Sequence, residues 1–166
     1  MINREDIKEP VESRRFEDYA VGSVCEYGPI SISEDEMVEF AEFFDPQSFH
    51  VDRELAKIGP FGEIVASGLH SLGIAMKLFV ENYLSKTGSL GSPGLDTLRF
   101  LQPVRPNEKL KLRVTVIDAR RSRSQPAKGI VKVRWELLNG QDEAALSLEG
   151  TNFLLVRDID ADIQEQ

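Results

Sequence analysis

The fold of this chain is decided by one stretch, Ser67-Gly-Leu-His-Ser-Leu-Gly-Ile-Ala-Met-Lys-Leu-Phe-Val-Glu-Asn-Tyr-Leu84. Its apolar residues recur on nearly every side of a helix with about 3.6 residues per turn. The stretch is too short and too polar to span a membrane, which needs about 20 apolar residues. A helix that is apolar all round is enclosed by other parts of the protein, so we expect a buried central helix.

The layer that encloses this helix is expected from segments that carry strand signals. Alternation of apolar and polar side chains with a period of two is typical of half-buried strands. Five segments are strand candidates: 22–32, 96–102, 109–116, 130–137 and 145–156. Pro103 and Pro106 close the second of them. The pattern predicts an α+β fold in which one curved antiparallel sheet wraps the central helix.

Two shorter helices are expected before the central one. Residues 33–44 begin with a Ser-x-x-Glu capping box and continue with an apolar stripe. Residues 52–58 begin at an Asp and are followed by a Gly-Pro pair that ends them. The expected order is therefore strand, helix, an irregular segment with the second short helix, central helix, and four strands.

The length of the chain, 166 residues, is that of one ordinary globular domain. The first residues alternate charge and polarity, and the last ones are acidic. We therefore expect an N-terminal extension over residues 1–15, a single domain over residues 16–157, and an acidic C-terminal tail over residues 158–166.

Charge and cysteine usage exclude several classes of function. The chain has 28 Asp and Glu against 20 Lys and Arg, a net charge of −8, which repels phosphate backbones and anionic lipid surfaces. We therefore expect no nucleic-acid partner and no membrane partner. The start of the chain lacks the apolar core of a secretory signal, and the lone Cys25 cannot form an internal disulfide. These features favour a cytoplasmic protein.

A carboxylate and a histidine lie close together in an apolar setting, in the segment Phe44-Asp-Pro-Gln-Ser-Phe-His50. Such a pair can do acid/base work, because imidazole titrates near pH ~6.5. In a continuous helix, a spacing of five would place the two side chains about 140° apart. Cooperation requires a break, which Pro46 supplies. Alternatively, Asp45 caps a helix that has Pro46 at its first position, and His50 is a hydrogen-bonded structural histidine.

Ser67 and Gly68 open the central helix. The first amides of a helix have no internal acceptor and lie at its positive end, so the Gly68 N–H is a candidate donor to an oxygen that gains negative charge. Alternatively, Ser67 is an ordinary N-cap and Gly68 relieves crowding against a strand. His50 and His70 are far apart, and no Cys/His cluster has ligand spacing, so we expect no metal site.

Together these segments resemble the MaoC-like dehydratase and (R)-specific enoyl-CoA hydratase family. The resemblance rests on residues 16–22, 44–50, 60–70 and 95–106 and extends over most of the chain. It implies a hot-dog fold, in which a curved antiparallel sheet wraps a long helix. It also implies a homodimer with active sites near the subunit interface.

The activity implied by the resemblance is reversible addition of water to a trans-2-enoyl-CoA, giving a 3-hydroxyacyl-CoA. The only cofactor-like group is the coenzyme A of the substrate itself. Carried over by position, Asp45 and His50 would be the catalytic pair, and Gly68 the backbone donor to the thioester carbonyl. Ser67 and Gln47 would complete the oxyanion and substrate-binding residues.

The chain departs from the Asp-x-Asn-Pro-x-His pattern of the better characterised hydratases, because the proline has moved to position 46 and Gln47 replaces Asn. Gln47 keeps an amide that can orient a neighbour. Two other functions stay open: an acyl-CoA thioesterase on the same fold, and a non-catalytic acyl-CoA-binding accessory subunit.

Coenzyme A is polyanionic, so an acidic protein needs a local positive region to receive it. The candidate region comprises Arg120, Arg121, Arg123 and Lys128, between two predicted strands. A solvated hairpin tip explains the same residues equally well.

Overall fold

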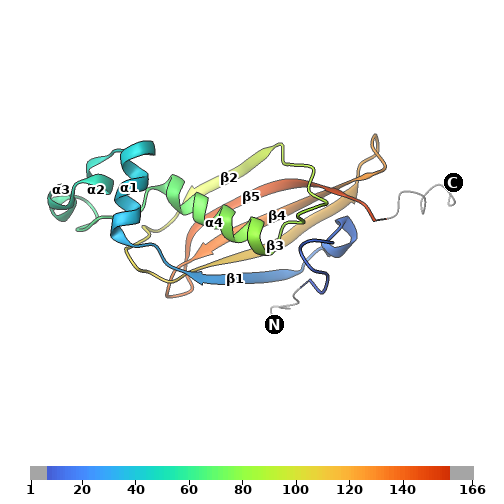
Figure 1. Ribbon diagram of the computed structural model, residues 1–166, viewed down its shortest axis with the longest axis horizontal. Helices are drawn as coiled ribbons and strands as arrows, with labels where there is room; N and C mark the ends of the chain where they lie inside the picture. The colour runs from blue at the N-terminus through green and yellow to red at the C-terminus, as the bar shows by residue number, and fades with distance from the viewer. Residues whose placement is uncertain (1–6, 158–166) are drawn as a thin grey trace.

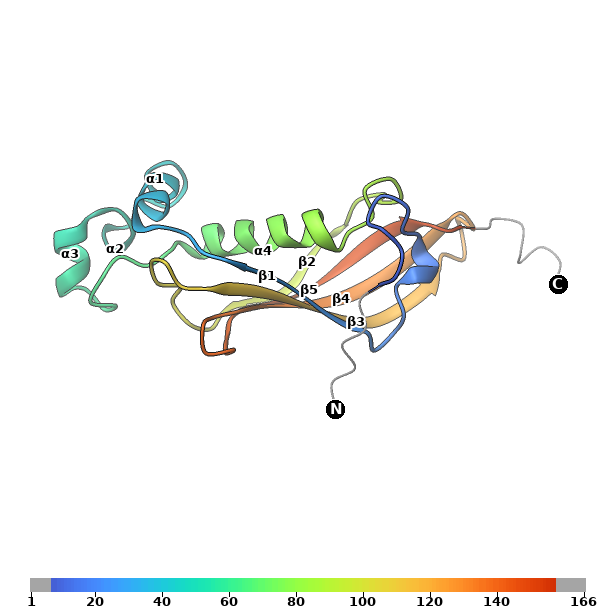
Figure 2. The same ribbon diagram turned by 60° about the horizontal axis from the view of Figure 1, so that its bottom comes forward.

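A computed structural model describes residues 7–157, in which an antiparallel sheet curves around one long helix (Figures 1 and 2). Residues 1–6 and the predicted acidic tail at 158–166 lie outside the described residues. The arrangement is the hot-dog fold, and it confirms the predicted α+β class.

All five predicted strands are present, and they form a single sheet in the order β1-β3-β4-β5-β2. Their bounds are β1 (Val24–Ile30), β2 (Gly94–Phe100), β3 (Leu110–Arg121), β4 (Lys128–Leu138) and β5 (Ala144–Leu155). The three long central strands bury alternate side chains along almost their whole length. The strands β1 and β2 are the two edges of the sheet.

The helices are α1 (Glu34–Phe44), α2 (Ser48–Val51), α3 (Arg53–Ile58) and α4 (Gly68–Asn82), preceded by a 3-10 turn, η1 (Phe16–Asp18). The predicted capping box of α1 is present, with Ser33 and Glu36 bonded to each other's backbone N–H. The single turn α2 was not predicted. Among residues 7–157, no helix has both the length and the apolarity needed to cross a membrane.

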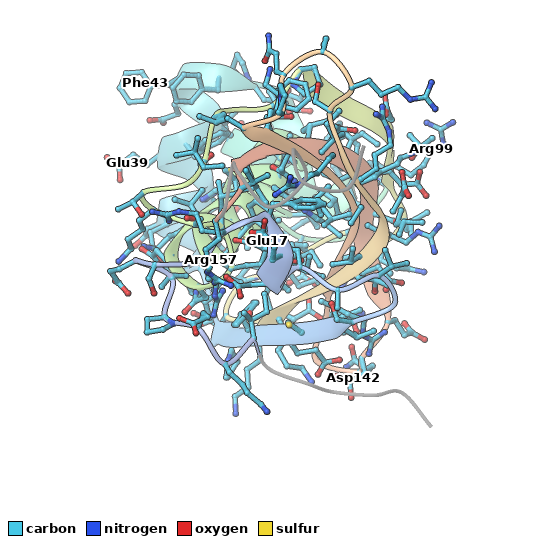
Figure 3. All side chains as sticks on the ribbon, turned by 90° about the vertical axis from the view of Figure 1, so that its right-hand side faces the viewer. Glu17, Glu39, Phe43, Arg99, Asp142 and Arg157 are labelled. Carbon is cyan, nitrogen blue, oxygen red and sulfur yellow. The ribbon has the colours of Figure 1, made fainter. Side chains whose placement is uncertain are left out.

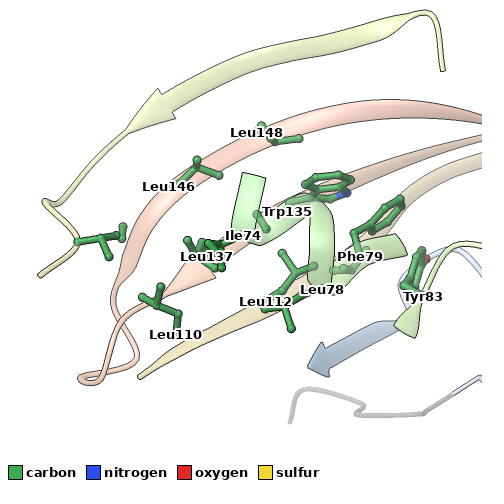
Figure 4. Close-up of a cluster of buried hydrophobic side chains, with 14 of the residues drawn as sticks. Ile74, Leu78, Phe79, Tyr83, Leu110, Leu112, Trp135, Leu137, Leu146 and Leu148 are labelled. Carbon is green, nitrogen blue, oxygen red and sulfur yellow. The ribbon is translucent and has the colours of Figure 1, made fainter. Parts of the chain in front are cut away.

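The core lies between α4 and the concave face of the sheet (Figure 4). Phe79 of α4 packs on Trp135 of β4, with ring centroids 4.2 Å apart. The prediction that α4 is enclosed on nearly every side is wrong, because its outer face carries Leu69, Met76 and Val80, which are 50%, 39% and 43% exposed. The sheet covers only one side of the helix.

The described part of the predicted N-terminal extension, residues 7–15, packs across the C-terminal end of α4. Arg14 is buried, and its Nη1 donates to the carbonyl oxygens of Asn82 and Tyr83 at 2.9 and 2.8 Å. Carbonyls at a helix end lack donors within the helix, so Arg14 acts as a cap. At the same end of the molecule, the Arg157 guanidinium pairs with Asp18, and the backbone N–H of Arg157 donates to the carboxylate of Glu17 (Figure 3).

Replacing Arg14 with Met is expected to lower the free energy of unfolding by about 2 kcal/mol, because helix-end carbonyls in a buried setting lose their donor. The matched control is Lys86→Met, which removes an exposed ion pair with Glu12 in the same contact and is expected to cost about 0–1 kcal/mol. Urea unfolding of both variants measures the difference. Equal losses would show that the guanidinium does not cap the helix.

Candidate active site

A cavity of about 380 Å³ lies where the short helices, the start of α4 and the end of β2 meet. Its wall is mostly apolar, with a few polar groups at one side. The lining residues are Asp45, Gln47, Phe49, His50, Phe61, Val65, Ala66, Gly68, Ser71, Phe100, Leu101, Gln102, Pro103, Val104 and Ala145. Four of the five predicted site residues line this cavity.

Asp45 and His50 converge because the helix breaks between them. The helix α1 ends at Phe44, Asp45 is its C-cap, and the chain becomes helical again only at Ser48. The Oδ2 of Asp45 lies 3.4 Å from the Nε2 of His50. The predicted break is confirmed. The alternative in which Asp45 caps a following helix is wrong, because its carboxylate accepts from the side chains of Ser67 and Gln47.

The tautomer of His50 is determined by the backbone. Its Nδ1 lies 2.7 Å from the carbonyl oxygen of Val65. A carbonyl oxygen can only accept, so Nδ1 carries the hydrogen, and Nε2 of neutral His50 presents a lone pair toward Asp45. Two acceptors, Nε2 and a carboxylate oxygen, thus face the same point. That geometry suits a molecule that donates two hydrogens, such as water.

The carboxylate of Asp45 accepts two further side-chain hydrogen bonds, from Ser67 Oγ to Oδ2 at 2.6 Å and from Gln47 Nε2 to Oδ1 at 2.8 Å. These donors lower the pKa of Asp45 below its ordinary value, the Ser67 bond being the larger cause. Asp45 is therefore an ionised acceptor at neutral pH.

The prediction that Ser67 binds substrate needs correction. Ser67 is 0% exposed and is absent from the cavity wall, so it cannot touch a ligand there. Its Oγ accepts from the N–H of Leu69 at 3.2 Å while donating to Asp45. Ser67 therefore joins the start of α4 to the acid/base pair. Burial of this kind has no signal in the sequence.

Gly68, the first residue of α4, lines the cavity with its backbone. Within residues 7–157, no acceptor is found for its N–H, as expected at the first position of a helix. A Cβ at Gly68 would lie 2.7 Å from ring atoms of Phe100. Glycine thus lets the Phe100 ring, at the end of β2, close against this helix terminus.

The predicted basic region does not lie at this cavity. Arg121 and Lys128 stand at the hairpin end of β3 and β4, whereas the cavity adjoins Ala145 at the opposite end of the sheet (Figure 1). His70 stacks on Phe40 of α1, with centroids 4.4 Å apart, and is not in the cavity wall. In the part of the chain that the structure describes, no group of three or more His, Cys, Asp or Glu could hold a metal ion.

Comparison with known proteins identifies the family. Residues 18–136 match the family described as "MaoC like domain". The chain belongs to this family. The MaoC-like dehydratase from Rhodospirillum rubrum matches the structure with a TM-score of 0.81 and 31% identity, covering 88% of this chain and 99% of that one. The uncharacterized protein YdeM of Bacillus subtilis is 32% identical over 111 residues, which are 67% of this chain and 79% of YdeM.

A relative with a stated activity matches a smaller share of this chain. The 3-hydroxyacyl-thioester dehydratase Z of Mycobacterium tuberculosis is 36% identical over 77 residues, which are 45% of this chain and 51% of the relative. The resemblance seen in the sequence motifs is thus confirmed at the level of family and fold.

Proposed function

We propose that this MaoC-like protein is a hydratase/dehydratase of acyl-CoA thioesters, adding water to a trans-2-enoyl-CoA to give a 3-hydroxyacyl-CoA, reversibly. The observation that carries the proposal is the pair of acceptors, Asp45 Oδ2 and His50 Nε2, beside the free N–H of Gly68 in an apolar cavity. Relatives described as dehydratases support it.

In this mechanism Asp45 and His50 hold one water molecule through its two hydrogens. They remove a proton from the water as its oxygen attacks C3, and they return a proton to C2, so the pair ends in its starting state. The Gly68 N–H stabilises the thioester oxygen while that oxygen is enolate-like. A positioned acid/base contributes about a hundred- to ten-thousandfold in rate, and a backbone donor of this kind about 3–4 kcal/mol.

The test is a panel of trans-2-enoyl-CoA thioesters, monitored for loss of the conjugated double bond. Consumption of the double bond with the thioester intact is the expected result. Release of free thiol without hydration would instead identify a thioesterase. Binding of acyl-CoA with neither reaction would identify an accessory subunit.

The pH profile of hydration should depend on Gln47. Replacing Gln47 with Met removes one of the hydrogen bonds that lower the pKa of Asp45, so that pKa rises. A base works only when ionised, so the acid limb of kcat/KM should move to higher pH. The control is Gln102→Met, at a glutamine that lines the same cavity, because the side-chain donors to Asp45 in the described part of the chain are Gln47 and Ser67. An unmoved acid limb in Gln47→Met would show that Asp45 is not the titrating base.

We also propose that the protein is a homodimer. The outer face of α4 exposes Leu69, Met76 and Val80, and the edge strand β2 exposes Leu95 and Phe100. Edge strands and apolar stripes of this kind are usually covered by a partner. Sedimentation at micromolar concentration should give twice the mass of the chain. A monomer would contradict an active site built near an interface.

A further inference from the structure

The strand β2 (Gly94–Phe100) is an edge of the sheet. Within the described part of the chain, it pairs only with β5 (Figure 1). Six of its seven residues are exposed. An edge strand presents a row of unpaired backbone groups to which another strand can bond. The opposite edge, β1, carries Pro29, which has no N–H to offer to a further strand.

A bulge in β2 brings two opposite charges onto one face of the sheet. Asp96 is in register with Glu149 of β5, and Arg99 is in register with Ser147. Three positions along β2 thus match two positions along β5, and residues two positions apart in a strand share a face. Leu148 of β5, between those two positions, is buried in the core. Asp96 and Arg99 therefore both lie on the convex face.

Two apolar side chains flank these charges on the concave face. Leu95 is in register with Gly150 of β5. Phe100 is in register with Leu146. Both of these β5 residues belong to the row that faces the core. Leu95 is 39% exposed and Phe100 is 54% exposed. Phe100 also lines the active-site cavity, so the edge of the sheet leads directly into the site.

Residues 95–100 are therefore complementary to a second copy of themselves. Two β2 strands that pair antiparallel about a two-fold axis at the centre of the bulge place Asp96 opposite the partner's Arg99. The same pairing places Leu95 opposite the partner's Phe100. Each contact occurs twice, with the charges on the convex face and the apolar side chains on the concave face. A register shifted by one residue would set an apolar side chain against a charge.

Both charges are available for such a contact. Among residues 7–157, the carboxylate of Asp96 makes no hydrogen bond or ion pair. The guanidinium of Arg99, at the outside of the sheet, donates within the same residues only to the carbonyl oxygen of Leu98, at 2.9 Å (Figure 3). Lys132, on the same face, is paired with Glu149 at 2.7 Å. A second copy therefore adds ion pairs to Asp96 and Arg99 without breaking one.

We propose that two copies of this chain join their β2 strands in this register, and that Leu95 of the partner subunit completes the active-site cavity beside Phe100. The arrangement rests on the proposed function and homodimer, and it names the partner residue that belongs to the site. The Phe100 ring closes against Gly68 at the start of α4, where a Cβ would lie 2.7 Å from the ring. The partner's Leu95 covers the side of this ring that is exposed in a single chain, and so holds the ring in place.

The register is tested by exchanging charges. Asp96→Arg and Arg99→Asp each set like charges against one another twice per dimer, and each should weaken dimerisation at least about tenfold in sedimentation over a dilution series. An equimolar mixture of the two variants should restore the dimer, because one chain then offers two cations and the other two anions at facing positions. The control is Asp118→Arg, an exposed residue of β3 in register with Lys132, which makes the same charge change away from the edge and should dimerise as the wild type does.

The contribution of the partner's Leu95 is tested in the mixed dimer. Asp45→Asn in the Asp96→Arg chain leaves one working site, in the Arg99→Asp chain. Leu95→Ala is then added to either chain. In the inactive chain, it should lower kcat/KM for a short trans-2-enoyl-CoA about tenfold, because it uncovers the Phe100 ring of the working site. In the active chain, it should have little effect.

The outcomes separate this arrangement from the proposed function. Dimers of wild-type strength in both single variants, or weak dimers that mixing does not restore, would overturn the register. Equal effects of Leu95→Ala in the two chains would overturn the contribution of the partner's Leu95 to the site. Sedimentation does not depend on turnover, so a wild-type protein that hydrates no substrate but shows rescue on mixing would overturn the proposed function and support the paired β2 strands.

Discussion

Replacing Asp45 with Asn, or His50 with Ala, is expected to lower kcat/KM for hydration of a short trans-2-enoyl-CoA at least about a hundredfold. Asp45→Asn removes the negatively charged base, and His50→Ala removes the Nε2 acceptor that lies 3.4 Å from it. The double variant should be little worse than either single one, because two groups that handle the same water act as a unit.

The matched control for these variants is Glu39→Gln, at an exposed carboxylate of α1 outside the cavity (Figure 3). It should retain full activity. Thermal unfolding and sedimentation establish that all four proteins are folded and have the same oligomeric state. Activity of Asp45→Asn within a few-fold of the wild type would show that this carboxylate is not part of the acid/base pair.

The sheet and the central helix could be predicted because their signals are local. Alternation along residues 109–116 and 130–137 marks the inward face of each strand, and the structure lengthens these strands without changing which residues face the core. The exposed outer face of α4 could not be predicted. Both faces of α4 carry apolar side chains, so the sequence does not show which face packs against the sheet.

The packing of the N-terminal segment could not be predicted from the sequence either. Arg14 looks like one more charge in a polar stretch, yet its guanidinium reaches carbonyls of Asn82 and Tyr83, far away in the chain. No periodic pattern in the sequence predicts a contact between residues so far apart in the chain.

The candidate site also has residues that could be predicted from the local sequence and contacts that could not. Asp45 and His50 could be predicted because they lie five residues apart with the helix-breaking Pro46 between them. Gly68 could be predicted because it lies at the start of a helix. The carbonyl of Val65 that orients His50, and the Phe100 ring against Gly68, depend on contacts between distant segments. The basic region of Arg120, Arg121, Arg123 and Lys128 was proposed to receive coenzyme A from its charge alone. The pairing of β3 with β4 places this region at the end of the sheet opposite the cavity.

The contribution of the Gly68 N–H can be isolated because proline is tolerated at the first position of a helix. Ser67 before it has φ −55° and ψ 143°, a conformation that suits a residue preceding proline. Gly68→Pro therefore deletes the N–H while the helix keeps its start. We expect kcat for hydration to fall about a hundred- to a thousandfold, the loss typical of one oxyanion donor.

Gly68→Ala is the matched control, because it adds a Cβ against the Phe100 ring, as proline does, but keeps the N–H. Building both variants on Phe100→Ala removes the ring that either side chain would meet, so the remaining difference between Pro and Ala is mainly the donor. If the N–H stabilises the enolate-like oxygen, the Pro variant falls far below the Ala variant in kcat, while the Asp45 limb of the pH profile stays in place in both. Equal rates for Pro and Ala would mean that the thioester oxygen is stabilised elsewhere, and that the free amide at the start of α4 takes no part in the reaction.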